Sequence, residues 1–242
     1  SLLKECNLSF FSEKEIRSIL LILLTRKDIN HLDLFKAINK VIPDALLIKL
    51  SVIEDCDLNS NTFSTLINDK LLVRSLPLLV FCSPLWEATL TKIRRYICIK
   101  SNKDDISAND NLREFTISLA QQCFLNEYIF TTEPKEVEAI KLIKSECLND
   151  KLDEFRISIL SCYIPLIKLT KELPFIQNYK SINNSFNSLM SMQLKEPLEE
   201  ETIKNSINTF GAIKDSISKE VKMQYEENPY PRWRYTSHLH EN

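Results

Sequence analysis

The chain of 242 residues contains a single glycine, Gly211. Tight β-hairpins rely on Asn-Gly, Asp-Gly or Gly-Gly turns, and the sequence has none of them. Loops that hold a nucleotide or S-adenosylmethionine against the backbone also need glycine, because a side chain would clash with the ligand. The sequence therefore predicts a fold without tight β-hairpins, and it predicts no cofactor-binding residue in this chain.

Apolar residues recur at helical spacing along almost the whole chain. Ile16, Ile19 and Leu23 share one face of a helix that begins at the capping box Ser12-x-x-Glu15. Further helices are expected at about 30–41, 44–53, 62–75, 84–100, 112–130, 134–148, 151–163, 178–192, 197–209 and 214–227. The predicted class is all-α. We expect stacked helical hairpins, similar to an irregular tetratricopeptide or α-solenoid bundle, although no tetratricopeptide consensus recurs.

Two features predict the domain organisation. The stretch 100–111 is rich in Asn and Asp, which favour turns, and it separates an N-terminal helical subdomain, 1–107, from a C-terminal one, 108–227. Asn228-Pro229 ends the last helix because proline excludes the helical conformation from the residue before it. Residues 228–242 are then an extended tail rich in proline and aromatic residues.

Composition bears on partners and compartment. The net charge of −2 argues against nucleic acid as the main ligand, and no apolar run approaches the roughly 20 residues of a membrane span. The seven cysteines form no Cys-x-x-Cys pair, which indicates buried thiols in a reducing compartment, the cytoplasm. His238 and His240 lack a third ligand, so no metal site is expected.

One candidate site follows the most regular apolar stripe, which is formed by Leu112, Phe115, Leu119, Cys123, Asn126 and Phe130. Polar side chains border this stripe and need partners if they are buried. The candidate residues are Gln122, Cys123, Asn126, Glu127 and Tyr128. They form either a hydrogen-bond cluster that fixes helix register or a ligand pocket. A nucleophilic Cys123 is disfavoured because no histidine lies near it in the sequence, and no catalytic residue is predicted.

The second candidate site is the segment 224–233, which concentrates aromatic residues, two prolines and an arginine. It is either a docking segment for a following domain or an extension that packs on its own chain. Arg232 and Trp233 are a plausible stacked pair, since guanidinium groups favour indole faces. The docking residues predicted here are Gln224, Tyr225, Asn228, Pro229, Tyr230, Pro231, Arg232 and Trp233.

Three segments carry a resemblance to a known family. Residues 224–233 read QYEENPYPRW, residues 120–130 fit A-x-Q-C-F-x-N-E-Y-x-F, and residues 196–200 read EPLEE. In these segments the chain resembles bacterial tetratricopeptide-associated class I S-adenosylmethionine-dependent methyltransferases. In that family the first signature stands between a helical region and a Rossmann-type catalytic domain.

The resemblance implies a non-catalytic helical module that positions a protein or other macromolecular substrate and docks its own methyltransferase domain. The family's cofactor, S-adenosylmethionine, would bind that domain and not this chain. A free-standing helical module for protein interaction or dimerisation is the alternative.

Overall fold

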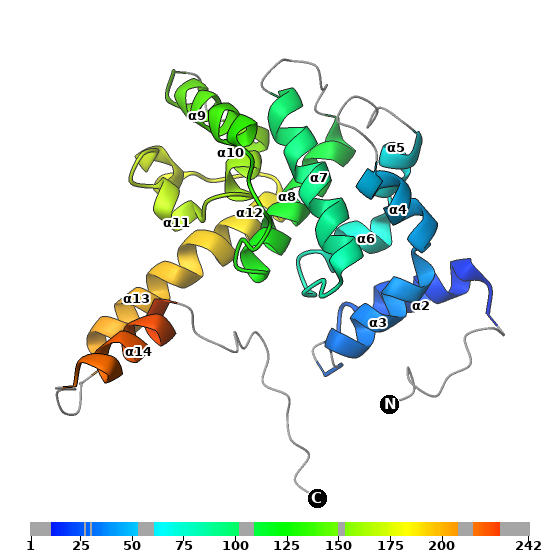
Figure 1. Cartoon of the computed structure of the whole chain (residues 1–242), viewed down its shortest axis with the longest axis horizontal. Coiled ribbons are helices and arrows are strands. Elements are labelled where there is room, and N and C mark those ends of the chain that lie inside the picture. The colour runs from blue at the N-terminus through cyan, green and yellow to red at the C-terminus, as the bar shows by residue number, and fades with distance from the viewer. Residues whose placement is uncertain are drawn as a thin grey trace, which may run out of the picture. The chain divides into compact units, whose positions relative to one another are not determined.

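A computed structural model of the chain describes residues 11–26, 28–29, 31–52, 61–101, 109–149, 153–207 and 215–227 (Figure 1). Within these residues every regular element is helical, which confirms the predicted all-α class. A 3₁₀ helix, Pro174–Asn178, and a π-helical turn, Ser191–Lys195, accompany the α-helices. The α-helices are α2 (Glu13–Leu23), α3 (His31–Val41), α4 (Asp44–Val52), α5 (Asn61–Ile67), α6 (Lys70–Ser75), α7 (Pro84–Ser101), α8 (Asp110–Leu125), α9 (Pro134–Asn149), α10 (Glu154–Ser161), α11 (Leu166–Leu169), α12 (Asn184–Met190), α13 (Glu196–Ser206) and α14 (Ser216–Glu227).

The predicted capping box opens α2. The Ser12 backbone N–H donates to Glu15 Oε2 at 2.8 Å, and the Glu15 N–H donates to Ser12 Oγ at 3.3 Å. Two otherwise unpaired backbone donors at the helix start are satisfied in this way.

The single helix predicted at 62–75 is wrong, because two short helices, α5 and α6, occupy this stretch. The break occurs at Asp69, whose Oδ1 accepts from the backbone N–H groups of Leu71 and Leu72 at 2.9 and 3.2 Å. Asp69 is therefore the N-cap of a new helix, and its other oxygen binds Arg17 Nη1 at 2.8 Å. The apolar residues of α5 and α6 are spaced as in one continuous helix, so the spacing alone does not reveal the N-cap at Asp69.

Helix α8 lies at the centre of the core. It packs against α5, α6, α7, α10 and α12 (Figure 1). Its residues 115–123 are all buried, including polar ones such as Thr116 and Gln122. A helix that is covered on all sides must satisfy its polar side chains internally.

The predicted helical stripe through Phe130 is too long, since α8 ends at Leu125. Asn126 caps the helix, and Glu127 and Tyr128 follow with φ of 59° each. Phe130 is nevertheless buried, with 5% of its surface exposed. Phe130 lies in the connection between α8 and α9 and packs on the same core as α8, so the apolar spacing continues beyond the end of the helix.

The predicted helix start at Pro197 is also wrong. Helix α12 continues through the π-helical turn into α13, so Pro197 lies inside a helical run. Proline cannot donate a backbone hydrogen bond to Gln193, four residues earlier. The π-helical turn accommodates this defect: the Glu196 N–H donates to Ser191 O, five residues back.

The chain divides into two compact units, Ser1–Leu198 and Glu199–Asn242. The sequence-based division into 1–107, 108–227 and 228–242 stays a prediction. Within the first unit, α7 packs against α8, α9 and α10, which follow it across the predicted boundary. No helix in the described ranges combines the length and the apolar character that crossing a membrane requires.

Candidate functional site

The five candidate residues in α8 and in the turn after it differ in how deeply they are buried. Gln122 and Cys123 are fully buried, whereas Asn126 and Tyr128 are half-buried and Glu127 is exposed. With its amide oriented to donate, Gln122 Nε2 lies 2.8 Å from Leu79 O and 3.3 Å from Leu76 O. Gln122 therefore links α8 to the turn that follows α6.

A strained turn follows α8. Its two consecutive left-handed residues, Glu127 and Tyr128, bring the Tyr128 N–H to Cys123 O at 2.8 Å. The Tyr128 hydroxyl donates to Ser161 O at 3.3 Å and thereby connects the turn to α10. Asn126 Oδ1 is buried and accepts no hydrogen bond from any described residue.

The tail residues are only partly described. Gln224 is an exposed residue of α14, and Tyr225 lies in the same helix. The remaining predicted docking residues, Asn228, Pro229, Tyr230, Pro231, Arg232 and Trp233, lie outside the described residues, as do His238 and His240. The predicted end of the helix at Asn228-Pro229 also falls there.

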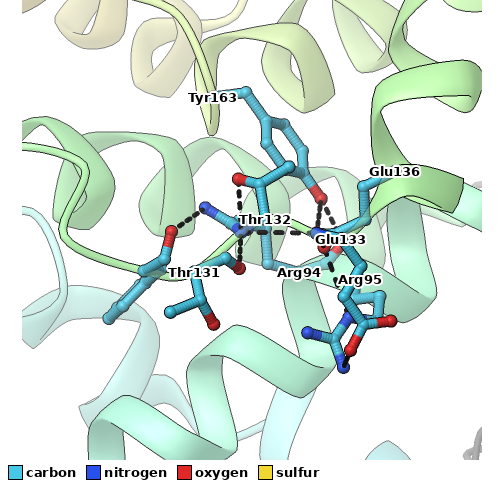
Figure 2. Close-up of polar contacts among 8 residues, drawn as sticks. Arg94, Arg95, Thr131, Thr132, Glu133, Glu136 and Tyr163 are labelled. Atoms are coloured by element: carbon cyan, nitrogen blue, oxygen red, sulfur yellow. Dashed lines mark hydrogen bonds and ion pairs between the residues drawn. The ribbon is translucent and has the colours of Figure 1, made fainter.

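A buried ionic cluster around Arg94 and Glu136 was not predicted from the sequence. The two side chains are 2% and 0% exposed, and Arg94 Nη2 lies 3.3 Å from Glu136 Oε1 (Figure 2). Arg95 Nε lies 3.3 Å from Glu136 Oε2, and Arg95 Nη1 pairs with Glu133 at 2.9 Å. Tyr163 completes the cluster by donating its hydroxyl to Glu136 Oε1 at 2.6 Å.

The start of α9 and the connection between α8 and α9 position the side chains of this ionic cluster. Pro134 is the first residue of α9, and the Glu133 N–H just before it donates to Glu136 Oε2 at 2.7 Å. This bond holds the Glu136 carboxylate at the helix N-terminus, where the helix dipole favours a negative charge. Arg94 donates to the carbonyl of Thr131 at 2.7 Å and to that of Phe130 at 3.4 Å, so it binds α7 to the α8–α9 connection.

Burial and charge act in opposite directions on Arg94. Burial disfavours its charged form, but electrostatic interactions with neighbouring groups, the Glu136 carboxylate among them, outweigh burial and raise the pKa of Arg94. The guanidinium carbon also lies 4.1 Å from the centre of the Tyr163 ring, a cation–π contact. For Tyr163 itself, burial raises the pKa of the phenol, which stays protonated as a donor.

Three buried thiols lie beside this cluster. Burial raises the pKa of Cys98 to about 12. It also raises the pKa of Cys162 well above its ordinary value, and a contact with Cys123 adds to this effect. Thiols with raised pKa values are poor nucleophiles, since the thiolate is the reactive form. The chemistry of these cysteines therefore fits packing better than catalysis.

A second unpredicted polar residue is Gln193, in the π-helical turn. Its Nε2 donates to Ala120 O at 2.9 Å and to Ser161 O at 3.3 Å, while its Oε1 accepts from the Leu166 N–H at 3.3 Å. One fully buried amide thus joins α8, α10 and α11 to the turn. The wide π-helical turn presents it to the core, and no sequence motif marks it.

Taken together, these groups hold helices in register. Around Arg94, the side chains of Ile97, Thr116, Cys162 and Tyr163 close on one another and leave no water-sized space. The polar atoms of Arg94 and Glu136 are buried against protein groups, and Arg94 Nε is a buried donor that lacks a partner among the described residues. Within the described ranges, no three His, Cys, Asp or Glu residues are grouped to hold a metal ion.

Comparison of the chain with protein-family models, with curated proteins and with solved structures found no match.

Proposed function

We propose that this chain is the non-catalytic helical module of an S-adenosylmethionine-dependent methyltransferase. The observation that carries the proposal is the ten-residue segment 224–233, which contains one tryptophan, two tyrosines and two prolines. Its first residues lie in the last turn of α14, at the end of the described helices. A catalytic domain that followed this segment would begin next to a helical body.

The ionic cluster supports a role as a scaffold. Arg94 and Glu136, together with the buried amides of Gln122 and Gln193, connect helices that are far apart in the sequence. Buried polar groups that are paired in this way rigidify a core. A rigid body of stacked helical hairpins, the arrangement that we propose for these helices, presents a broad surface suited to an extended macromolecular substrate. Buried thiols at Cys98, Cys123 and Cys162 are compatible with a cytoplasmic location.

The proposal is tested by reading the coding sequence beyond Asn242 and by measuring binding of radiolabelled S-adenosylmethionine. We expect a glycine-rich strand–loop–helix to follow, and we expect the longer protein, but not the 242-residue chain, to bind the cofactor. Binding of the cofactor by the 242-residue chain would overturn the proposal.

The connector role is tested separately, by substitutions in the longer protein. Tyr230→Ala and Trp233→Ala should loosen domain docking and lower methyl transfer, and Phe11→Ala, at an exposed aromatic residue outside the tail, is the control. Unchanged domain orientation in small-angle scattering, together with unchanged activity, would contradict this role.

A free-standing interaction or dimerisation module is the second candidate. The exposed isoleucines of the second unit favour it, because Ile203 and Ile207 are 51% and 65% exposed. A stop codon directly after Asn242 and concentration-dependent association of the chain would support this alternative.

A further inference from the structure

The helices of the second unit expose apolar side chains instead of burying them. In α13 no residue is buried, and Ile203 is 51% exposed. Ile207, which directly follows the last residue of α13, is 65% exposed. In α14, Val221 and Met223 are 44% and 57% exposed. Helices of 11 and 12 residues are only marginally stable in water by themselves, so apolar contacts are needed to hold them. These helices therefore call for a covering segment.

Carboxylates precede the two exposed isoleucines. Ile203 lies in the last helical turn of α13, and Ile207 follows the end of the helix by one residue. Glu199 and Glu200 precede Ile203 by one helical turn, and Glu201 lies beside them; all three side chains are exposed. A segment that covers this face must bring both apolar and positively charged side chains.

The chain itself contains such a segment. Residues 228–242 follow α14 directly, belong to the same unit as residues 199–227, and include two arginines and three aromatic residues, namely Arg232, Arg234, Tyr230, Trp233 and Tyr235. Fifteen residues span up to about 50 Å when extended, whereas α13 with its 11 residues is roughly 16 Å long. The length of the segment is therefore sufficient to reach α13 and lie along it.

We propose that residues 228–242 dock on the exposed face of α13, with aromatic side chains on Ile203 and Ile207 and arginines against Glu199, Glu200 and Glu201. This inference does not rest on the methyltransferase proposal, since both partners lie within the 242-residue chain. It assigns to the tail a binding surface on its own unit.

Charge favours this occupant over a second copy of the same face. Residues 199–227 carry seven carboxylates (Glu199, Glu200, Glu201, Asp215, Glu220, Glu226 and Glu227) against four lysines (Lys204, Lys214, Lys219 and Lys222). Two such faces would repel each other. Residues 228–242 carry two arginines and one glutamate, so their net charge is opposite in sign.

Tryptophan fluorescence tests the proposal in the 242-residue chain. The chain has two tryptophans, and Trp86 is fully buried, so the difference between the unsubstituted chain and a Trp233→Phe variant isolates the emission of Trp233. We expect this emission to be shielded from acrylamide, independently of protein concentration. Full access of the quencher to Trp233 would overturn the proposal, and shielding that appears only at high concentration would assign the face to a second copy.

Substitutions on α13 identify the surface. Ile203→Gln should lower the docking equilibrium constant of the tail by roughly five- to tenfold, because about half of an isoleucine side chain loses its apolar contact. Gln has at least the helix propensity of Ile, so α13 itself is not weakened. Ile48→Gln on α4 is the matched control, since Ile48 is also 51% exposed. Equal quenching of Trp233 in both variants would contradict docking on α13.

The charge contribution is read from a triple substitution of Glu199, Glu200 and Glu201 to Gln. We expect this variant to expose Trp233 and to lose the salt dependence of docking, since exposed charge pairs are screened by salt. Glu138→Gln, an exposed position on α9, is the control. Shielding of Trp233 that is unaffected by both the triple substitution and salt would refute the ionic part of the proposal.

Discussion

Replacing Glu136 by Gln tests whether the ionic cluster holds the core together. The Glu136 carboxylate is 0% exposed and accepts hydrogen bonds from Tyr163 at 2.6 Å and from the Glu133 N–H at 2.7 Å. It also neutralises Arg94 and Arg95, each at 3.3 Å. Gln has nearly the same shape as Glu, so the substitution removes the charge and leaves the packing almost unchanged.

The expected loss follows from the burial of Arg94, of which 2% is exposed. Removing one partner of a buried ion pair leaves an uncompensated charge and costs about 3–5 kcal/mol. That is a large share of a typical free energy of unfolding of about 5–15 kcal/mol. The comparison is Glu172→Gln: Glu172 is 57% exposed and pairs with Lys144 at 2.7 Å. Exposed pairs of this kind contribute at most about 1 kcal/mol.

Urea unfolding followed by circular dichroism measures both variants. We expect Glu136→Gln to lower the free energy of unfolding several times more than Glu172→Gln does. The double variant Arg94→Met/Glu136→Leu should lose less than Glu136→Gln, because it removes both charges and Arg95 keeps its partner Glu133 at 2.9 Å. Equal losses in Glu136→Gln and Glu172→Gln would refute the reasoning.

Three further predictions concern single residues. Burial raises the pKa of Cys98 from its ordinary value of 9.0 to about 12, so its thiol contributes stability below pH 9 that is lost as the pH rises towards 12, by up to about 1.4 kcal/mol per pH unit. Cys98→Ala should flatten this alkaline decline in urea unfolding, and an unchanged slope would contradict the assignment. Asp69→Ala should destabilise by about 1–2 kcal/mol through loss of the α6 cap. Asp69→Asn should cost less because the amide oxygen still caps, and equal costs would assign the effect to the Arg17 pair. Glu127→Gly should raise the melting temperature because it relieves a φ of 59°, and Glu127→Val should lower it.

The sequence predicts best those helices whose first residue is typical of a helix start. The helix expected at 84–100 is α7, Pro84–Ser101, and the one expected at 134–148 is α9, Pro134–Asn149. Both begin at a proline, which is suited to the first helical position. The predicted helix boundaries are wrong where one residue fits both a helix interior and a helix end. The apolar spacing around Asp69 predicts a helix interior and Pro197 predicts a helix start, whereas Asp69 caps α6 and Pro197 lies within a continuous helical run.

The helix containing Pro197 could not be predicted from propensity because its reason is tertiary. Its missing N–H is tolerated next to a π-helical turn, and that turn places Gln193 fully within the core. The contacts of Gln193 lie 27 to 73 residues away in the sequence. A local pattern cannot report such partners, and a proline followed by glutamates in the next turn is typical of a helix start.

The apolar periodicity of α8 indicates Gln122, whereas no local pattern indicates the ionic cluster around Arg94 and Glu136. Gln122 borders an apolar stripe, so the periodicity indicates a polar residue that needs a partner if it is buried. Arg94 and Arg95 are adjacent charges on α7, a pattern that normally indicates a solvated face. Only their partners show otherwise, and Glu136 and Tyr163 lie 42 and 69 residues further along the chain. A helix start at residue 134 is predicted from the sequence, but whether the Glu136 carboxylate faces water or a buried arginine depends on how α7 and α9 pack. A pair of arginines flanked by apolar residues, as Arg94 and Arg95 are by Ile93 and Ile97, together with a carboxylate at the third position of a later helix, is therefore the combination that indicates such a core.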